Sequence, residues 1–151
     1  MINFNLNGAD VSVDVPDETT LLSVLIDTLQ VAGPKYGCGK SQCGSCSVML
    51  DGLIVASCQT PAKSAAGRSV TTTEGLLEDG QPNALQQAFI DEQAAQCGYC
   101  TSGMVITAQA LLDTNPNPSE SEIRAALNGN LCRCGTQNRV VRAVIRAAEG
   151  G

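Results

Sequence analysis

The stretch that decides the fold of this chain is GCGKSQCGSC, residues 37–46. Cys38, Cys43 and Cys46 lie within it, and Cys58 follows further along, which gives the pattern C-x4-C-x2-C-x11-C. Glycine, serine and other polar residues fill the gaps between the first three cysteines, so the segment is predicted to be a loop. Three thiols in one loop, with a fourth nearby, indicate a metal or cluster site.

This spacing is the one found in plant-type [2Fe-2S] sites. Gly37, Gly39 and Gly44 are expected to adopt positive φ, so that loop amides point at thiolate and sulfide acceptors. A four-cysteine zinc site or a structural thiol cluster is the alternative. Zinc ribbons, however, usually have two knuckles of closely spaced cysteines, and this loop has a single C-x2-C.

Four more cysteines, Cys97, Cys100, Cys132 and Cys134, form the pattern C-x2-C-x31-C-x-C. Each pair is expected in a turn before a helix, where free amides and the helix dipole favour anionic thiolates. Spacing alone leaves both zinc and a second [2Fe-2S] cluster open. Two clusters would use all eight cysteines and leave no stray thiol. Disulfides are disfavoured, because the N-terminal sequence gives no sign of an oxidising compartment.

Composition excludes several classes of protein. The chain of 151 residues has no histidine, which excludes Rieske centres, cysteine-histidine zinc fingers and a histidine-activated cysteine nucleophile. A net charge of −6 without a run of Lys or Arg argues against nucleic acid as a partner. No segment approaches the roughly 20 apolar residues of a membrane helix, so direct membrane insertion is not expected. We expect a cytoplasmic protein, with co-export or membrane association through a partner left open.

The first half is predicted to be a small α+β unit. Its predicted elements are a hairpin over 2–15, a helix over 20–29, a second hairpin over 47–57 and an edge strand over 69–72. Asn7-Gly8 and Asp51-Gly52 mark the two hairpin turns. Gly33-Pro34 is predicted to end the helix.

The second half has the period of helices and no strand signal. Four helices are predicted, from Asn83, from about Ser102, after the capping box Ser119-x-x-Glu122, and over 137–148. Gly129 fits the left-handed position after the third helix. The predicted division is therefore a first domain over 1–74, a connector over 75–82 and a helical domain over 83–151.

Taken together, the motifs GCGKSQCGSCSVMLDG, QCGYCTSGM and NGNLCRCGT resemble the small iron-sulfur subunit of the xanthine oxidase family of molybdenum hydroxylases. The resemblance covers nearly the whole chain. Within this family, the chain is similar to the small subunits of bacterial isoquinoline, nicotinate and aldehyde oxidoreductases. It implies an α+β chain with a β-grasp, plant-type ferredoxin-like domain followed by an all-α four-helix bundle. Each domain would hold one [2Fe-2S] cluster through its own four cysteines.

The resemblance also implies a function. The chain would relay single electrons from a molybdenum pterin, in its cytosine dinucleotide form, on a large subunit that hydroxylates an N-heterocycle or an aldehyde. Electrons would pass through the second cluster and then the first to a flavin subunit, a cytochrome or another acceptor. Gln96 would hydrogen-bond the pterin and Cys134 would be the ligand nearest to it. No catalytic residue is expected in this chain.

Two charged residues lie in the cysteine loops, Lys40 and Arg133. Many family members carry an acidic residue where this chain has Lys40, and a positive charge there would raise the potential of the first cluster. Arg133 would meet the partner, offset cluster charge or simply be solvated. A free-standing two-cluster ferredoxin and a zinc-stabilised interaction module are the alternatives to the subunit interpretation.

Overall fold

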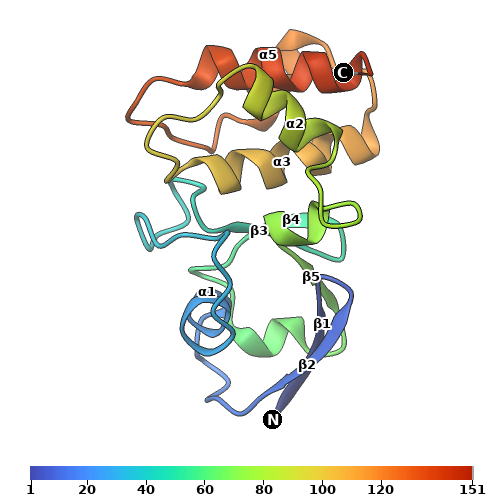
Figure 1. The fold of residues 1–151 in the computed structure, drawn as a ribbon. Helices are drawn as coiled ribbons and strands as arrows, with labels where there is room; N and C mark the ends of the chain where they lie inside the picture. Colours follow the sequence, from blue (N-terminus) through green and yellow to red (C-terminus); the bar gives the residue numbers. More distant parts are fainter. Residues whose placement is uncertain (151) are drawn as a thin grey trace.

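The computed structural model describes residues 1–150 and has a sheet half and a helical half, with the two chain termini at opposite ends (Figure 1). The strands are β1 (Ile2–Leu6), β2 (Ala9–Val13), β3 (Ser47–Leu50), β4 (Leu53–Ala56) and β5 (Ser69–Thr71). They form one sheet in the order β2-β1-β5-β3-β4. The β1–β5 pair is parallel and the other pairs are antiparallel.

Both predicted hairpins are confirmed, and their turns show why. Asn7 and Gly8 have φ of 51° and 90°, and Asp51 and Gly52 have φ of 50° and 81°. Two successive positive φ values match the right-handed twist of the flanking strands, and Asn-Gly and Asp-Gly adopt them at little cost. The turns therefore fix the pairing of β1 with β2 and of β3 with β4.

The prediction that β5 is an edge strand is wrong. It lies in the middle of the sheet, between β1 and β3, and the fully buried Val70 pairs with Leu6 on one side and Leu50 on the other. This strand is three residues long with a single apolar side chain, so its local sequence carries little information about burial. Its place depends on pairing with strands far away in the chain.

The helix predicted over 20–29 is present but irregular. A short α1 (Leu21–Ser23), capped by Thr20, continues as the π-helical turn η1 (Val24–Thr28). The chain leaves it through Gln30 at φ 55°, so the helix ends before Gly33-Pro34 rather than there. Leu21, Val24 and Leu25 are fully buried in the core of the sheet half.

The four predicted helices of the second half are confirmed as α2 (Ala84–Asp91), α3 (Thr101–Thr114), α4 (Glu120–Ala126) and α5 (Gln137–Ala148). Asn83 with Gln86, and Ser119 with Glu122, form complete capping boxes. Gly129 does not adopt the predicted left-handed conformation. Its carbonyl instead lies against Gly44 of the other half. The division at 1–74, 75–82 and 83–151 stays a prediction.

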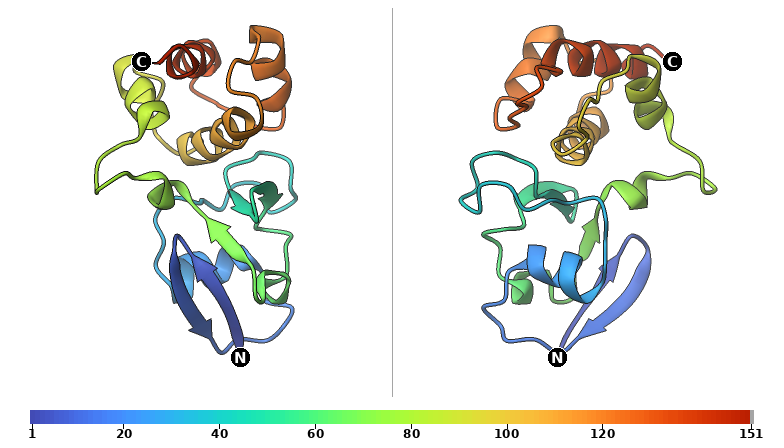
Figure 2. Two further views of the ribbon diagram at one scale, coloured as in Figure 1. Left: turned by 90° about the vertical axis from the view of Figure 1, so that its right-hand side faces the viewer. Right: turned by 60° about the vertical axis from the view of Figure 1, so that its left-hand side comes forward.

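The two halves pack directly on each other through α3 and β3 (Figure 2). All four residues of β3 are buried, because Val48 and Leu50 belong to the core of the sheet half while the strand also contacts α3. The helices have a separate apolar core. The interface therefore fixes how the loops at its edge face each other.

Gly33 contacts both the short turn that follows β5 and helix α3. Its N–H donates to Glu74 Oε1 at 2.6 Å, and its carbonyl accepts from the Ser102 hydroxyl. Glu74 lies in the 3₁₀ turn η3 (Thr73–Leu76) and also accepts from the Thr72 and Thr73 hydroxyls. Partial burial raises the pKa of Glu74, but these hydrogen bonds outweigh it and hold the pKa below its usual value.

Candidate cysteine centres

The first cysteine loop directs backbone amides at sulfur. The N–H groups of Gln42 and Lys40 lie 3.2 and 3.3 Å from Cys38 Sγ, and the N–H of Cys38 lies 3.4 Å from Cys43 Sγ. Hydrogen bonds from Gln42 and then Lys40 lower the pKa of the Cys38 thiol to about 7. The loop is thus built to hold thiolate, which is the form that binds metal.

Cys46 and Cys58, the other two cysteines of the first pattern, form a second, buried pair. Both are buried beside Leu22, and they contact each other. Burial raises the pKa of the Cys46 thiol to about 11. A bound cation would reverse this effect, since a coordinating thiol is deprotonated outright.

The glycines of this loop have two different roles. Gly39 and Gly44 have φ of 65° and 77°, as predicted. Gly37 does not have positive φ, so that prediction is wrong. A Cβ on Gly37 would lie 2.6 Å from Cys43 Sγ, so the residue is needed for close approach of the backbone to sulfur.

The second quartet comes together from the two predicted turns. Cys100 is the N-cap of α3, and Cys132 and Cys134 precede α5. Cys100 contacts Cys132, and Cys97 contacts Cys134. Burial and then Cys132 raise the pKa of Cys100 to about 11. Burial alone would raise the pKa of the Cys132 thiol. Hydrogen bonds from Thr136 outweigh burial and lower the pKa to about 7, and the Thr136 Oγ1 lies 3.1 Å from the sulfur.

The sulfurs of each quartet are therefore grouped two and two. All eight cysteines are free thiols. Among residues 1–150, no three or more cysteine or acidic side chains are close enough to hold one metal ion. A [2Fe-2S] cluster takes four cysteine thiolates spread over two irons, so paired sulfurs with amide donors fit that group.

Hydrogen bonds hold the two cysteine loops against each other. The N–H of Leu131 donates to the carbonyl of Cys43 at 2.9 Å, and Asn130 Nδ2 donates to Gly44 O at 3.4 Å. The Tyr99 hydroxyl donates to the carbonyl of Tyr36. Sequence reasoning missed these contacts, because they join residues more than 60 positions apart. Thr136 was missed too, although its place just after C-x-C was a usable signal.

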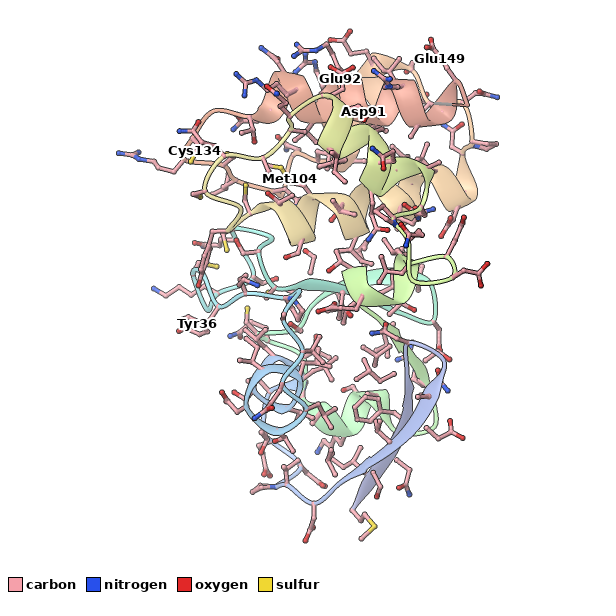
Figure 3. The ribbon with its side chains drawn as sticks, viewed as in Figure 1. Tyr36, Asp91, Glu92, Met104, Cys134 and Glu149 are labelled. Carbon is pink, nitrogen blue, oxygen red and sulfur yellow. The ribbon has the colours of Figure 1, made fainter. Side chains whose placement is uncertain are left out.

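The remaining predicted site residues lie on the outside of these loops. Gln96 is exposed, and its side chain makes no hydrogen bond to the described part of the chain. Lys40 and Arg133 are also exposed. Figure 3 shows Cys134 and Tyr36 on the same side of the molecule, one in each half.

Comparisons with known proteins agree with this geometry. A 2Fe-2S iron-sulfur cluster binding domain matches residues 4–71, and a [2Fe-2S] binding domain matches residues 72–145. One of the nicotinate dehydrogenase subunits of Pseudomonas putida is 53% identical over 148 residues, which cover 98% of this chain and 94% of its own. The chain belongs to the small iron-sulfur subunits of the xanthine oxidase family.

Solved structures of this family have the same fold. Quinoline 2-oxidoreductase from Pseudomonas putida 86 superimposes with a TM-score of 0.94 at 39% identity, over 98% of this chain and 93% of that one. Aldehyde oxidoreductase from Desulfovibrio gigas gives 0.92 at 39% identity, over 98% of this chain but 17% of its own. The chain is thus an electron-transfer subunit of a heteromeric molybdenum hydroxylase, with a β-grasp ferredoxin-like half and a helical half, each a [2Fe-2S] domain.

Among the described residues, no helix is both long enough and apolar enough to cross a bilayer.

Proposed function

We propose that Cys38, Cys43, Cys46 and Cys58 hold one [2Fe-2S] cluster, and that a second set, Cys97, Cys100, Cys132 and Cys134, holds the other. The observation that carries the proposal is that two paired quartets lie on loops joined by a backbone hydrogen bond. When bound, the clusters supply one-electron redox chemistry. The protein would hold the first cluster at a place where burial excludes most water from Cys46 and Cys58.

The second centre is the entry side in this proposal. Gln96 is free to donate or accept a hydrogen bond, and it lies next to Cys97, which pairs with Cys134. A molybdenum pterin held by the large subunit, in the cytosine dinucleotide form, would lie against these three residues. Cys134 would then be the ligand nearest to the pterin, and Arg133 beside it would meet the partner.

The loops offer a short connection between the centres. Leu131 is covalently adjacent to Cys132, and its N–H bonds the Cys43 carbonyl at 2.9 Å. Ligands of the two centres are thus linked through one peptide unit and one hydrogen bond. We assign this connection as the route from the second centre to the first.

The first centre is the exit side. Tyr36 and Lys40 are exposed beside Cys38, so an acceptor such as a flavin subunit or a cytochrome can approach this loop. The large subunit would hydroxylate an N-heterocycle or an aldehyde. We place the protein in the cytoplasm, because free thiols used as cluster ligands suit a reducing compartment.

Metal analysis and EPR test the proposal. The native chain should contain about four irons, as two [2Fe-2S] clusters with four cysteine ligands each require, and should give two distinct signals after reduction. Cys58→Ser should abolish one signal and Cys132→Ser the other. A colourless zinc protein would contradict the proposal. Recovery of the chain without a large molybdenum-containing partner would favour a free-standing ferredoxin instead.

A further inference from the structure

An apolar groove of about 730 Å³ opens where the connector meets the helical half. It is lined by η3 and the residues after it, by α2 and the residues after it, by the first turns of α3 and by Arg139 of α5. Phe89 and Val105 line it from the helical core. Leu77 and Ile90 border it, and they are 45% and 58% exposed. Large apolar side chains left this exposed around a groove mark a binding surface.

Two polar groups of the groove have at most one hydrogen-bond partner within the described chain. Thr101 Oγ1 is buried and makes no hydrogen bond. Arg139 is exposed and is the one charged residue among the twelve that line the groove. Within the described chain its guanidinium donates a single hydrogen bond, to the Gln93 carbonyl at 3.4 Å. Arg142 and Arg146, further along α5, both form ion pairs with Glu92. Arg139 is therefore a cation available to an external carboxylate.

The groove is continuous with the entry side of the second centre. Ala95 and Ser102 line it, and they flank the loop that carries Gln96, Cys97 and Cys100. A partner that reaches Gln96 therefore lies next to one end of the groove. In the Desulfovibrio gigas aldehyde oxidoreductase, this fold is 17% of one longer chain, so much more protein is attached to the same frame there.

We propose that the groove receives a segment of the large molybdenum-binding subunit, which inserts an apolar side chain between Leu77 and Ile90 and brings a carboxylate to Arg139. This rests on the proposed function, because it names the surface through which that partner binds. Side chains that fill a desolvated pocket near the centre of an interface, arginine among them, carry most of the binding energy. The contact would hold the entry side of the second centre against the partner.

The test is co-purification from the cells that make the complex, with a tag on this chain and the large chain and molybdenum measured per iron. The groove variants are Ile90→Asp and Arg139→Glu. The matched controls are Leu53→Asp, at a side chain 69% exposed on β4, and Lys63→Glu, an exposed cation of the sheet half. Iron content and both EPR signals are recorded for every variant, so that loss of folding is recognised.

Both groove variants should keep their iron and signals but recover roughly tenfold less large chain, as for loss of a central contact. The controls should match the wild type. Groove variants that recover as much large chain as the wild type would overturn the docking proposal. The groove would then be left to another occupant, such as a second copy of this chain or a small molecule. Should Ile90→Asp fail to fold, Arg139→Glu decides alone, since Arg139 is exposed. A wild-type chain that brings down no large molybdenum chain would overturn the proposed function itself, which is a separate outcome.

Discussion

Replacing Gly103 by alanine should destabilise the protein, although the same change in most helices is stabilising. Gly103 lies in the first turn of α3, against the first cysteine loop. A Cβ there would lie 3.0 Å from the carbonyl carbon of Gly44, closer still to its oxygen, and 3.2 Å from Ser45 Cα. All three are backbone atoms, which cannot rotate away as a flexible side chain would. The two halves must therefore move apart.

The opposing contributions can be compared. Alanine in a helix interior gains about 1 kcal/mol over glycine. Overpacking against a rigid neighbour costs about 1–3 kcal/mol. Separation also stretches the hydrogen bonds from Leu131 to Cys43 and from Asn130 to Gly44, each worth about 1 kcal/mol. The net expectation is a loss of about 1–3 kcal/mol in the free energy of unfolding.

Denaturant unfolding of the iron-loaded chain measures the change in the free energy of unfolding caused by Gly103→Ala. Rapid reduction, followed through the two EPR signals, measures the rate of electron transfer between the two centres. Gly129→Ala is the control, because a Cβ at Gly129 meets no atom within 4 Å and its φ is not positive. The control should change stability by less than about 0.5 kcal/mol. A Gly103→Ala protein as stable as the wild type, with unchanged transfer between centres, would refute the reasoning.

Three further predictions concern single side chains. Glu74→Gln should lose about 1 kcal/mol of stability, a modest value because the carboxylate is only half buried. The pKa of Glu74 is lowered in the folded protein, so its carboxylate contributes its full share to the free energy of unfolding above about pH 4.5. That share is lost as the pH falls through the pKa of the folded state. The unfolding curves of wild type and variant should therefore converge in acid. Lys40→Glu should lower the potential of the first centre in a redox titration, whereas the remote Lys63→Glu should not; the absence of a downward shift would contradict the role of Lys40. Cys134→Ser should slow electron transfer from the molybdenum partner in stopped-flow reduction, and a normal rate would remove Cys134 from the entry position.

The parts of the fold that sequence predicted are those fixed by local chemistry. Asn7-Gly8 and Asp51-Gly52 specify their turns through backbone conformation, and Asn83 and Ser119 specify helix starts through side-chain caps. The segments that carry the cysteines were predicted as loops and turns for the same reason, and the assignment of the two quartets as cluster ligands stays a prediction.

The parts that sequence did not predict depend on distant residues. β5 is central because β1 and β3 pair with it, and nothing within its three residues states that. Gly37 and Gly129 were expected to need positive φ, and neither has it. Gly37 instead leaves room for Cys43 Sγ, whereas a Cβ at Gly129 would meet no atom within 4 Å. A glycine in a sequence signals a constraint without telling whether the constraint is conformational or steric.

The contact between the cysteine loops has a consequence for maturation. The segment Asn130–Leu131 leads directly into Cys132, and it is held by carbonyls of Cys43 and Gly44 in the other half. Metal binding orders the loop that supplies its ligands. Iron loaded into one proposed centre would therefore order backbone that the other centre requires, and by reciprocity chelation of one would loosen its neighbour. The centre that remains in Cys58→Ser or Cys132→Ser should keep its signal but lose iron to a chelator faster than the same centre in the wild type.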